Sequence, residues 1–175
     1  GAVGLVAADE EPIIGQARDG HVALLVGETT GHLGQSALLA EVFNREDGDA
    51  PAVDLGAEKR NGEFIRANRD LIKACTDLSD GGLALAAFEM AEEAGVGVQI
   101  DANDTQTLFG EDQARYLVAC NFDQAEALML AAGQAGVPLT TVGKFAGDTV
   151  KIGGSEASLE DLSSLFRSSF AEAVA

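Results

Sequence analysis

The chain has 175 residues, of which 46% are hydrophobic and 5% are aromatic. It contains 21 glycines. This length and composition predict one globular domain over residues 1–175, with enough apolar material for a core. The 29 acidic and 11 basic residues give a net charge of −18, which argues against nucleic acid and against an anionic membrane as partners, because both are bound through clustered lysine and arginine.

Targeting and redox features are few. Cys75 and Cys120 are too far apart for a CxxC metal site and lie in apolar runs, so we expect buried, reduced thiols. The sequence contains no signal peptide and no apolar stretch long enough to span a bilayer, which makes the cytoplasm the default location. The chain starts at Gly1 in the middle of a pattern, without an initiator methionine; we therefore expect a fragment of a larger protein.

The first half of the chain predicts strands and helices in alternation. Short apolar runs indicate buried strands, and apolar residues at helical spacing indicate helices. We expect strands at 4–7 and 22–26, a helix over 33–43, a longer helix over about 54–73, and a helix over 81–94.

The second half continues the alternation and ends in a hairpin and a helix. We expect strands at 96–100 and 116–120, a helix over 123–134, a hairpin formed by 139–145 and 149–152, and a last helix opened by a capping-box variant at Ser158. The two strands of a hairpin are antiparallel, so a hairpin near the end excludes a purely parallel sheet. The predicted fold class is therefore α/β, a three-layer sandwich around a mixed sheet.

The run Thr76-Asp77-Leu78-Ser79-Asp80-Gly81-Gly82-Leu83-Ala84 is the most informative feature. It places two carboxylates and a diglycine where an apolar run becomes a helix, and such a junction can hold a hard cation or a phosphate. The alternative is an ordinary helix start, with Ser79 or Asp80 as the N-cap and no ligand. The local pattern alone leaves both interpretations open.

A second glycine-rich junction runs from Gly27 to Ser36 between a predicted strand and a predicted helix. Its backbone N–H groups suit phosphate contacts, although it lacks the Gly-Lys-Ser/Thr of a Walker A loop. An ordinary strand-to-helix turn is the alternative. His32 has no identifiable base or nucleophile as a partner, so the sequence does not support triad chemistry.

Three other polar segments allow both a functional and a structural interpretation. Arg115 could bind a phosphate or carboxylate through its planar fork, or pair with Glu111 at i,i+4 spacing. Asp101, Asn103 and Asp104 are similar to a metal loop but lack EF-hand spacing, so a solvated turn is expected. The last segment is a basic series on one helix face, which keeps the helix soluble or docks on an acidic surface: Arg60, Arg66, Arg69 and Lys73.

Several segments together resemble one family. They are Gly27-Glu28-Thr29 through Leu33-Gly34-Gln35-Ser36, Val53-Asp54-Leu55, Asp77-Leu78-Ser79-Asp80-Gly81-Gly82-Leu83-Ala84 with Glu89-Met90-Ala91, and Phe109-Gly110-Glu111-Asp112-Gln113-Ala114-Arg115. In this order they are similar to the C-terminal domain of formylglycinamidine ribonucleotide synthase, over essentially the whole chain. The fold is shared with aminoimidazole ribonucleotide synthase, selenophosphate synthetase, thiamine-monophosphate kinase and a hydrogenase maturation factor, which this chain resembles less.

The resemblance implies an ATP-dependent ligase of purine biosynthesis. Such enzymes phosphorylate the amide oxygen of formylglycinamide ribonucleotide and then displace phosphate with glutamine-derived ammonia. The implied cofactors are ATP and Mg²⁺, and the implied partners are preceding ATP-binding domains of the same chain, a glutaminase subunit and a small accessory subunit.

The resemblance also implies roles for individual residues. Asp77 would be the metal ligand, and the nucleotide or phosphate side would be formed by Gly31, His32, Gly34, Ser36, Gly81, Gly82 and Arg115. Glu111 and Arg115 would shape a cleft shared with the preceding domain. Thr76 stands where the family commonly has histidine, so any role of that imidazole is missing.

The resemblance implies a domain without a catalytic residue of its own, because the family's catalytic histidine belongs to another domain, so we expect the isolated chain to be inactive. A standalone nucleotide-binding, metal-binding or regulatory module is the alternative, and a purely structural partner domain is a third. If the chain is the terminal domain of a duplicated synthase, the loops 27–36 and 76–82 should meet at one edge of the sheet.

Overall fold

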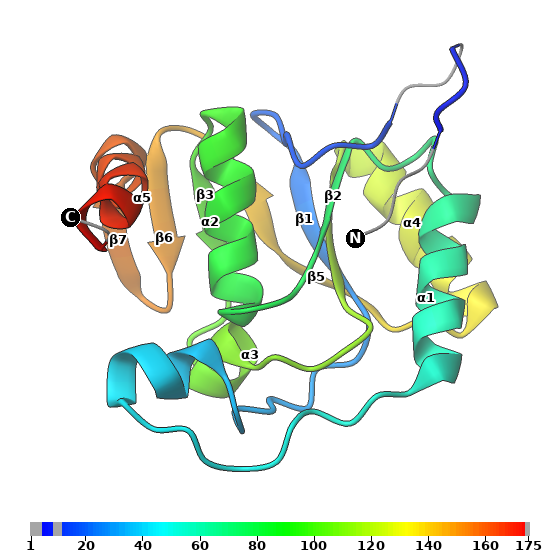
Figure 1. The fold of residues 1–175 in the computed structure, drawn as a ribbon. Helices are drawn as coiled ribbons and strands as arrows, with labels where there is room; N and C mark the ends of the chain where they lie inside the picture. The colour runs from blue at the N-terminus through cyan, green and yellow to red at the C-terminus, as the bar shows by residue number, and fades with distance from the viewer. Residues whose placement is uncertain (1–4, 9–11, 174–175) are drawn as a thin grey trace.

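The computed structural model describes residues 5–8 and 12–173, with the side chains of 170–172 excepted. Helices cover both faces of a seven-stranded sheet whose order is β2-β4-β1-β5-β3-β6-β7 (Figure 1). All neighbouring strands are antiparallel except β3 and β6, which are parallel. The predicted mixed α/β fold is therefore confirmed.

The strands are β1 (Val22–Val26), β2 (Ala74–Asp77), β3 (Val98–Ile100), β4 (Tyr116–Cys120), β5 (Leu139–Phe145), β6 (Thr149–Ile152) and β7 (Ser155–Ser158). The α-helices are α1 (Leu55–Ala67), α2 (Gly82–Ala94), α3 (Thr105–Phe109), α4 (Phe122–Ala135) and α5 (Leu159–Ala173), and a short π-helix, η1, covers Leu38–Val42.

Alternating side chains of the central strands divide the core into two layers. In β1, Ala23 and Leu25 pack in the cluster that contains α2, whereas Leu24 and Val26 pack in the cluster that contains α1 and α4. This alternation follows from the two-residue period of a strand. Burial of a leucine of this kind contributes about 1.5–3 kcal/mol, so both helical layers are fixed on the sheet by hydrophobic contact.

The predicted terminal hairpin is wrong, although the bounds of its two strands are right. β3 lies between β5 and β6, antiparallel to the first and parallel to the second. Gly97 permits this close approach, because a Cβ there would overlap the carbonyl oxygen of Thr149 and lie 2.7 Å from that of Ala146. β6 pairs instead with β7, a strand that its polar sequence did not reveal.

Two predicted helices are shorter in the structure. The segment 33–43 is helical only over η1, because Gln35 adopts a φ of +55° and its N–H donates to the carbonyl of Asp47 rather than to a helical turn. α1 ends at Ala67 and not near 73, because Asn68 leaves helical geometry and its side-chain amide donates to the carbonyl of Phe64. The chain then turns back to form β2.

The expectation for the N-terminal strand is wrong, whereas the expected start of the last helix is confirmed. Residues 5–7 form no strand, and Gly4 of that predicted strand lies outside the described residues. α5 is capped as expected, since Ser158 Oγ accepts the N–H of Asp161 at 3.3 Å. α5 then packs on α2 through an edge-to-face contact of Phe166 with Phe88, their ring centroids 5.4 Å apart.

The two cysteines are free thiols in different surroundings. Cys120 is buried, as expected, whereas Cys75 is only half-buried. Burial raises the pKa of the Cys75 thiol to about 12, with a further contribution from the charge of Asp77, and burial raises that of Cys120 to about 11. Both thiols are therefore protonated near neutral pH, which disfavours the nucleophilic thiolate. Within the described part of the chain, the helices are too short or too polar to cross a bilayer.

Candidate functional site

Glu111 joins the two glycine-rich junctions. Its Oε1 atom accepts the backbone N–H of Ala37 at 2.8 Å and that of Gly81 at 2.9 Å. Ala37 directly follows the first junction (27–36), and Gly81 lies within the second (76–82). The two loops therefore meet at one edge of the sheet, near α3 (Figure 1), as expected from the sequence.

The carboxylate of Asp112 binds the backbone of the first junction. Oδ2 accepts the N–H groups of Thr30 at 3.2 Å and Gly31 at 2.9 Å, while Oδ1 accepts the N–H of His32 at 3.2 Å and the Thr30 hydroxyl. Burial by itself would raise the pKa of Asp112. The hydrogen bonds from these three residues and the charge of Arg115 outweigh burial, so the pKa lies below its usual value.

Arg115 is buried next to the first junction. Its side chain is 0% exposed, and Nη1 lies 3.9 Å from Oδ2 of Asp112. The guanidinium also donates to the carbonyls of Asp112 and Gly110 and to the Thr29 hydroxyl. The ion-pair partner is thus Asp112, three residues earlier, and not Glu111, which was one of the two partners that the sequence left open. Burial lowers the pKa of Arg115 from its usual value, against the opposing charges of Asp112 and Glu111.

Close backbone packing explains the glycines of the two junctions. A Cβ on Gly82 would lie 2.5 Å from the carbonyl oxygen of Gly110, and one on Gly31 would lie 2.6 Å from Cβ of Gln106. Gly31 also has a φ of +79°. These glycines let the junctions pack against α3 and the segment 109–115.

The predicted N-cap of α2 is wrong. Ser79 and Asp80 are exposed, and the cap residue is Gly81, whose φ is +76° and which offers no side chain. The acceptor comes from Glu111 instead, so a residue distant in sequence supplies the negative charge at this helix N-terminus.

Three further candidate residues of the first junction, His32, Gly34 and Ser36, also make contacts within the protein. The ring of His32 contacts the carbonyl of Asp49 through Nε2 at 2.8 Å, and a Cβ on Gly34 would meet that same carbonyl at 2.5 Å. Ser36 is buried, and its Oγ accepts the N–H of Leu39 at 3.3 Å. These contacts tie the junction to the long loop that leads to α1.

Asp77 is the last residue of β2 and is exposed. It pairs in register with Tyr116 of β4. Burial is the main cause that raises the pKa of Glu89 and of Tyr116, and the charge of Asp77 adds to both shifts. An exposed carboxylate in this position can serve as one ligand of a hard cation.

A complete metal site is not formed by the described residues alone. They contain no group of three or more His, Cys, Asp or Glu side chains arranged to hold a metal ion. Asp104, from the segment similar to a metal loop, is instead the N-cap of α3, since its Oδ1 accepts the N–H of Thr107 at 2.8 Å. Mg²⁺ at Asp77 would need oxygens from a phosphate, water or another domain.

A nucleotide phosphate does not fit the two junctions as they are arranged. The N–H groups of Gly31 and His32 donate to Asp112, that of Gly81 donates to Glu111, and that of Gly82 donates to the carbonyl of Ser79. A phosphate at these amides remains a prediction and requires a carboxylate to leave.

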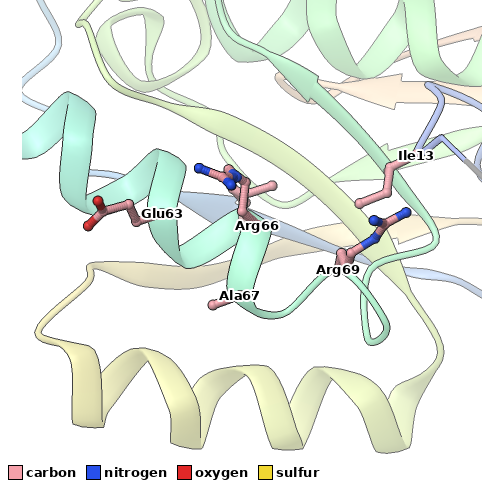
Figure 2. Close-up of a pocket in the computed structure, with 6 residues that line it drawn as sticks. Ile13, Glu63, Arg66, Ala67 and Arg69 are labelled. Carbon is pink, nitrogen blue, oxygen red and sulfur yellow. The ribbon is translucent and has the colours of Figure 1, made fainter. Parts of the chain in front are cut away.

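The basic series lies elsewhere. A hollow of about 600 Å³ at the C-terminal end of α1 is lined by Ile13, Glu63, Ile65, Arg66, Ala67 and Arg69 (Figure 2). The glycine-rich junctions lie at the opposite end, where α1 begins (Figure 1). The two arginines therefore do not contribute to the candidate site.

One contributor that the sequence did not reveal is Asn61 of α1. It is 1% exposed, and its side-chain amide donates to the carbonyl of Ala114 at 2.8 Å. Ala114 has a φ of +58°, a conformation that alanine rarely adopts. Asn61 thereby holds the turn between Asp112 and Arg115. An asparagine on the buried side of a helix was the available signal.

Comparison with known proteins places this arrangement in a family. Residues 18–153 match the family model described as AIR synthase related protein, C-terminal domain. The chain is 86% identical over all 175 residues to phosphoribosylformylglycinamidine synthase subunit PurL of Ruegeria sp. (strain TM1040), of which it covers 24%. It is 48% identical over 144 residues, 79% of the chain, to the subunit PurL of Brucella ovis, of which it covers 20%. The chain thus spans about a quarter or less of these relatives.

Solved structures share the fold at low sequence identity. PurL of T. maritima complexed with FGAR superposes with a TM-score of 0.68 at 20% identity, over 86% of this chain and 29% of that one. Thiamine-monophosphate kinase from Stenotrophomonas maltophilia K279a superposes with a TM-score of 0.54 at 21% identity, over 83% of this chain and 54% of that one. From the family match over residues 18–153, the chain belongs to the AIR synthase related protein, C-terminal domain family.

Proposed function

We propose that this chain is the C-terminal domain of the large subunit of phosphoribosylformylglycinamidine synthase. The whole enzyme would convert formylglycinamide ribonucleotide, ATP and glutamine-derived ammonia to formylglycinamidine ribonucleotide in purine biosynthesis. Support comes from the 86% identity to a PurL subunit over the full 175 residues. The convergence of the two junctions on Glu111 is the structural observation that carries the proposal.

The domain would act by bordering a cleft with the ATP-binding domains of the same chain. The edge that carries the junctions also carries the exposed carboxylate of Asp77, which we propose as a protein ligand of Mg²⁺ in the assembled enzyme. The proposed partners are these domains, a glutaminase subunit and a small accessory subunit, in the cytoplasm. The solved structure of PurLQS from Thermotoga maritima, which shares this fold, supports an assembled complex.

The described residues supply binding and positioning groups rather than a chemical step. Asp112 and Arg115 neutralise each other and fix the first junction, while Glu111 fixes its distance from the second. The enzyme's ATP, when bound, would supply the phosphoryl group that activates the substrate amide. A standalone regulatory module of the same fold is the competing function.

Turnover tests the proposal. Full-length protein supplied with ATP, Mg²⁺, formylglycinamide ribonucleotide and ammonium salt should release ADP and phosphate in step with formylglycinamidine ribonucleotide. Residues 1–175 alone should give no turnover above a no-protein control. Absence of product with the full-length protein, or turnover by residues 1–175, would contradict the proposal.

A further inference from the structure

The phosphate role implied for the first junction disagrees with its geometry. Three successive backbone N–H groups, those of Thr30, Gly31 and His32, converge on the carboxylate of Asp112 at 3.2, 2.9 and 3.2 Å. The Thr30 hydroxyl donates to the same carboxylate. Successive N–H groups of this kind form a concave anion site, and here a side chain of the protein already fills it.

The positive charge of Arg115, next to the junction, is also neutralised by a residue of the protein, Asp112. The Arg115 side chain is 0% exposed and lies 3.9 Å from Oδ2 of Asp112. A phosphate in this concave anion site would have to displace the Asp112 carboxylate from Arg115 and from its four donors, which are three backbone N–H groups and the Thr30 hydroxyl. Both anions cannot be held there together, because their like charges would lie within a few ångströms in a buried setting.

The second junction repeats the arrangement. Glu111 takes the N–H of Gly81 at the start of α2, where the helix dipole favours an anion, together with the N–H of Ala37. Two adjacent carboxylates of one segment thus occupy five backbone donors. The donors belong to loops that lie 30 to 82 residues away in sequence.

We propose that Asp112 is an internal anion that takes the place of a ligand phosphate in the loop 29–32. The backbone N–H groups of Thr30, Gly31 and His32 therefore bind a carboxylate of the protein itself and are not available to the phosphate of a nucleotide. This inference does not rest on the proposed function, since it concerns only the occupancy of the loop.

Hydrogen exchange of the full-length protein, with and without inorganic phosphate, tests the inference. In the wild type, protection of residues 29–32 should not change with phosphate. In Asp112→Ala, the exchange rate of residues 29–32 should rise about tenfold or more, and it should fall again when phosphate binds the N–H groups that the carboxylate no longer occupies. Asp104→Ala, which removes a carboxylate cap from α3, is the matched control; phosphate should not restore protection at Thr107.

Asp112→Asn provides a second variant of nearly the same size if the alanine variant does not fold. It keeps one acceptor oxygen and loses the charge, so phosphate should restore its protection as well. Phosphate that protects loop 29–32 in the wild type would overturn the inference. Failure of phosphate to restore protection in every folded Asp112 variant would also overturn it.

Discussion

Nη1 of Arg115 lies 3.9 Å from Oδ2 of Asp112, with side chains that are 0% and 9% exposed. Both residues contact the first glycine-rich junction, Arg115 at Thr29 and Asp112 at Gly31. Its value to the fold comes from hydrogen bonding as much as from charge, because the guanidinium also donates to two backbone carbonyls and a hydroxyl. Removal of either partner leaves the other charge buried without its counter-ion.

Arg115→Lys should therefore destabilise the protein by about 2–4 kcal/mol, because an ammonium cannot reproduce the planar fork. Arg45→Lys is the matched control, since Arg45 and Asp47 form a solvent-exposed pair with side chains 59% and 55% exposed, and an ion pair screened by water contributes little to stability. Calorimetric unfolding of the full-length protein measures both. Equal losses of stability would contradict the structural role of Arg115.

The lowered pKa of Asp112 predicts an acid-dependent loss of stability. A carboxyl whose pKa is lower in the folded than in the unfolded state stabilises the fold fully above its ordinary value of 3.8, and this contribution is lost as pH falls through the folded pKa. The difference in melting temperature between wild type and Asp112→Asn should thus be large at pH 6 and should become smaller as the pH is lowered from about 4. A difference that stays constant with pH would exclude this linkage.

Two glycine-to-alanine changes should have opposite effects. Gly97→Ala places a Cβ against the carbonyl oxygen of Thr149 and should cost about 1–3 kcal/mol through forced separation of β3 from the turn before β6. Gly133→Ala lies in α4 with no atom within 4 Å and should stabilise by about 0.5–1 kcal/mol. Thermal unfolding of both variants measures the signs. A stabilised Gly97→Ala would refute the close approach.

Asp77→Asn should weaken nucleotide retention in the full-length protein while leaving the fold intact. The change removes one charged oxygen from the proposed Mg²⁺ site, and a loss of about tenfold or more in affinity is expected. Asp80→Asn, an exposed carboxylate three residues along, is the control. Nucleotide that co-elutes equally with wild type and Asp77→Asn would reject the ligand assignment.

Local patterns predicted much of the fold because the strands are short apolar runs bounded by turn residues. β4, β5 and β6 have the expected bounds. Their order was not predictable locally, since β3 enters between β5 and β6 through the close contact at Gly97. The polar strand β7 carried no hydrophobic alternation, and the helix expected over 33–43 was shortened by the conformation of Gln35.

The candidate site was predicted as a set of segments but not as a set of contacts. The meeting of the junctions at one edge was foreseen from their places after predicted strands. The partners of Glu111 and Asp112 were not, because each carboxylate bonds amides that are tens of residues away. The sequence left open whether Arg115 binds a phosphate or carboxylate or pairs with Glu111 at i,i+4; in the structure it is buried, follows the turn at Ala114 and pairs with Asp112.

Hydrogen exchange of Glu111→Ala in the full-length protein tests most directly the central claim that one carboxylate joins the two junctions. The account predicts that peptides containing Ala37 and Gly81 both exchange about tenfold or more faster than in the wild type. Glu156→Ala, which removes an exposed ion pair with Lys151, should change neither peptide. Faster exchange in only one of the two peptides, or in neither, would contradict the account.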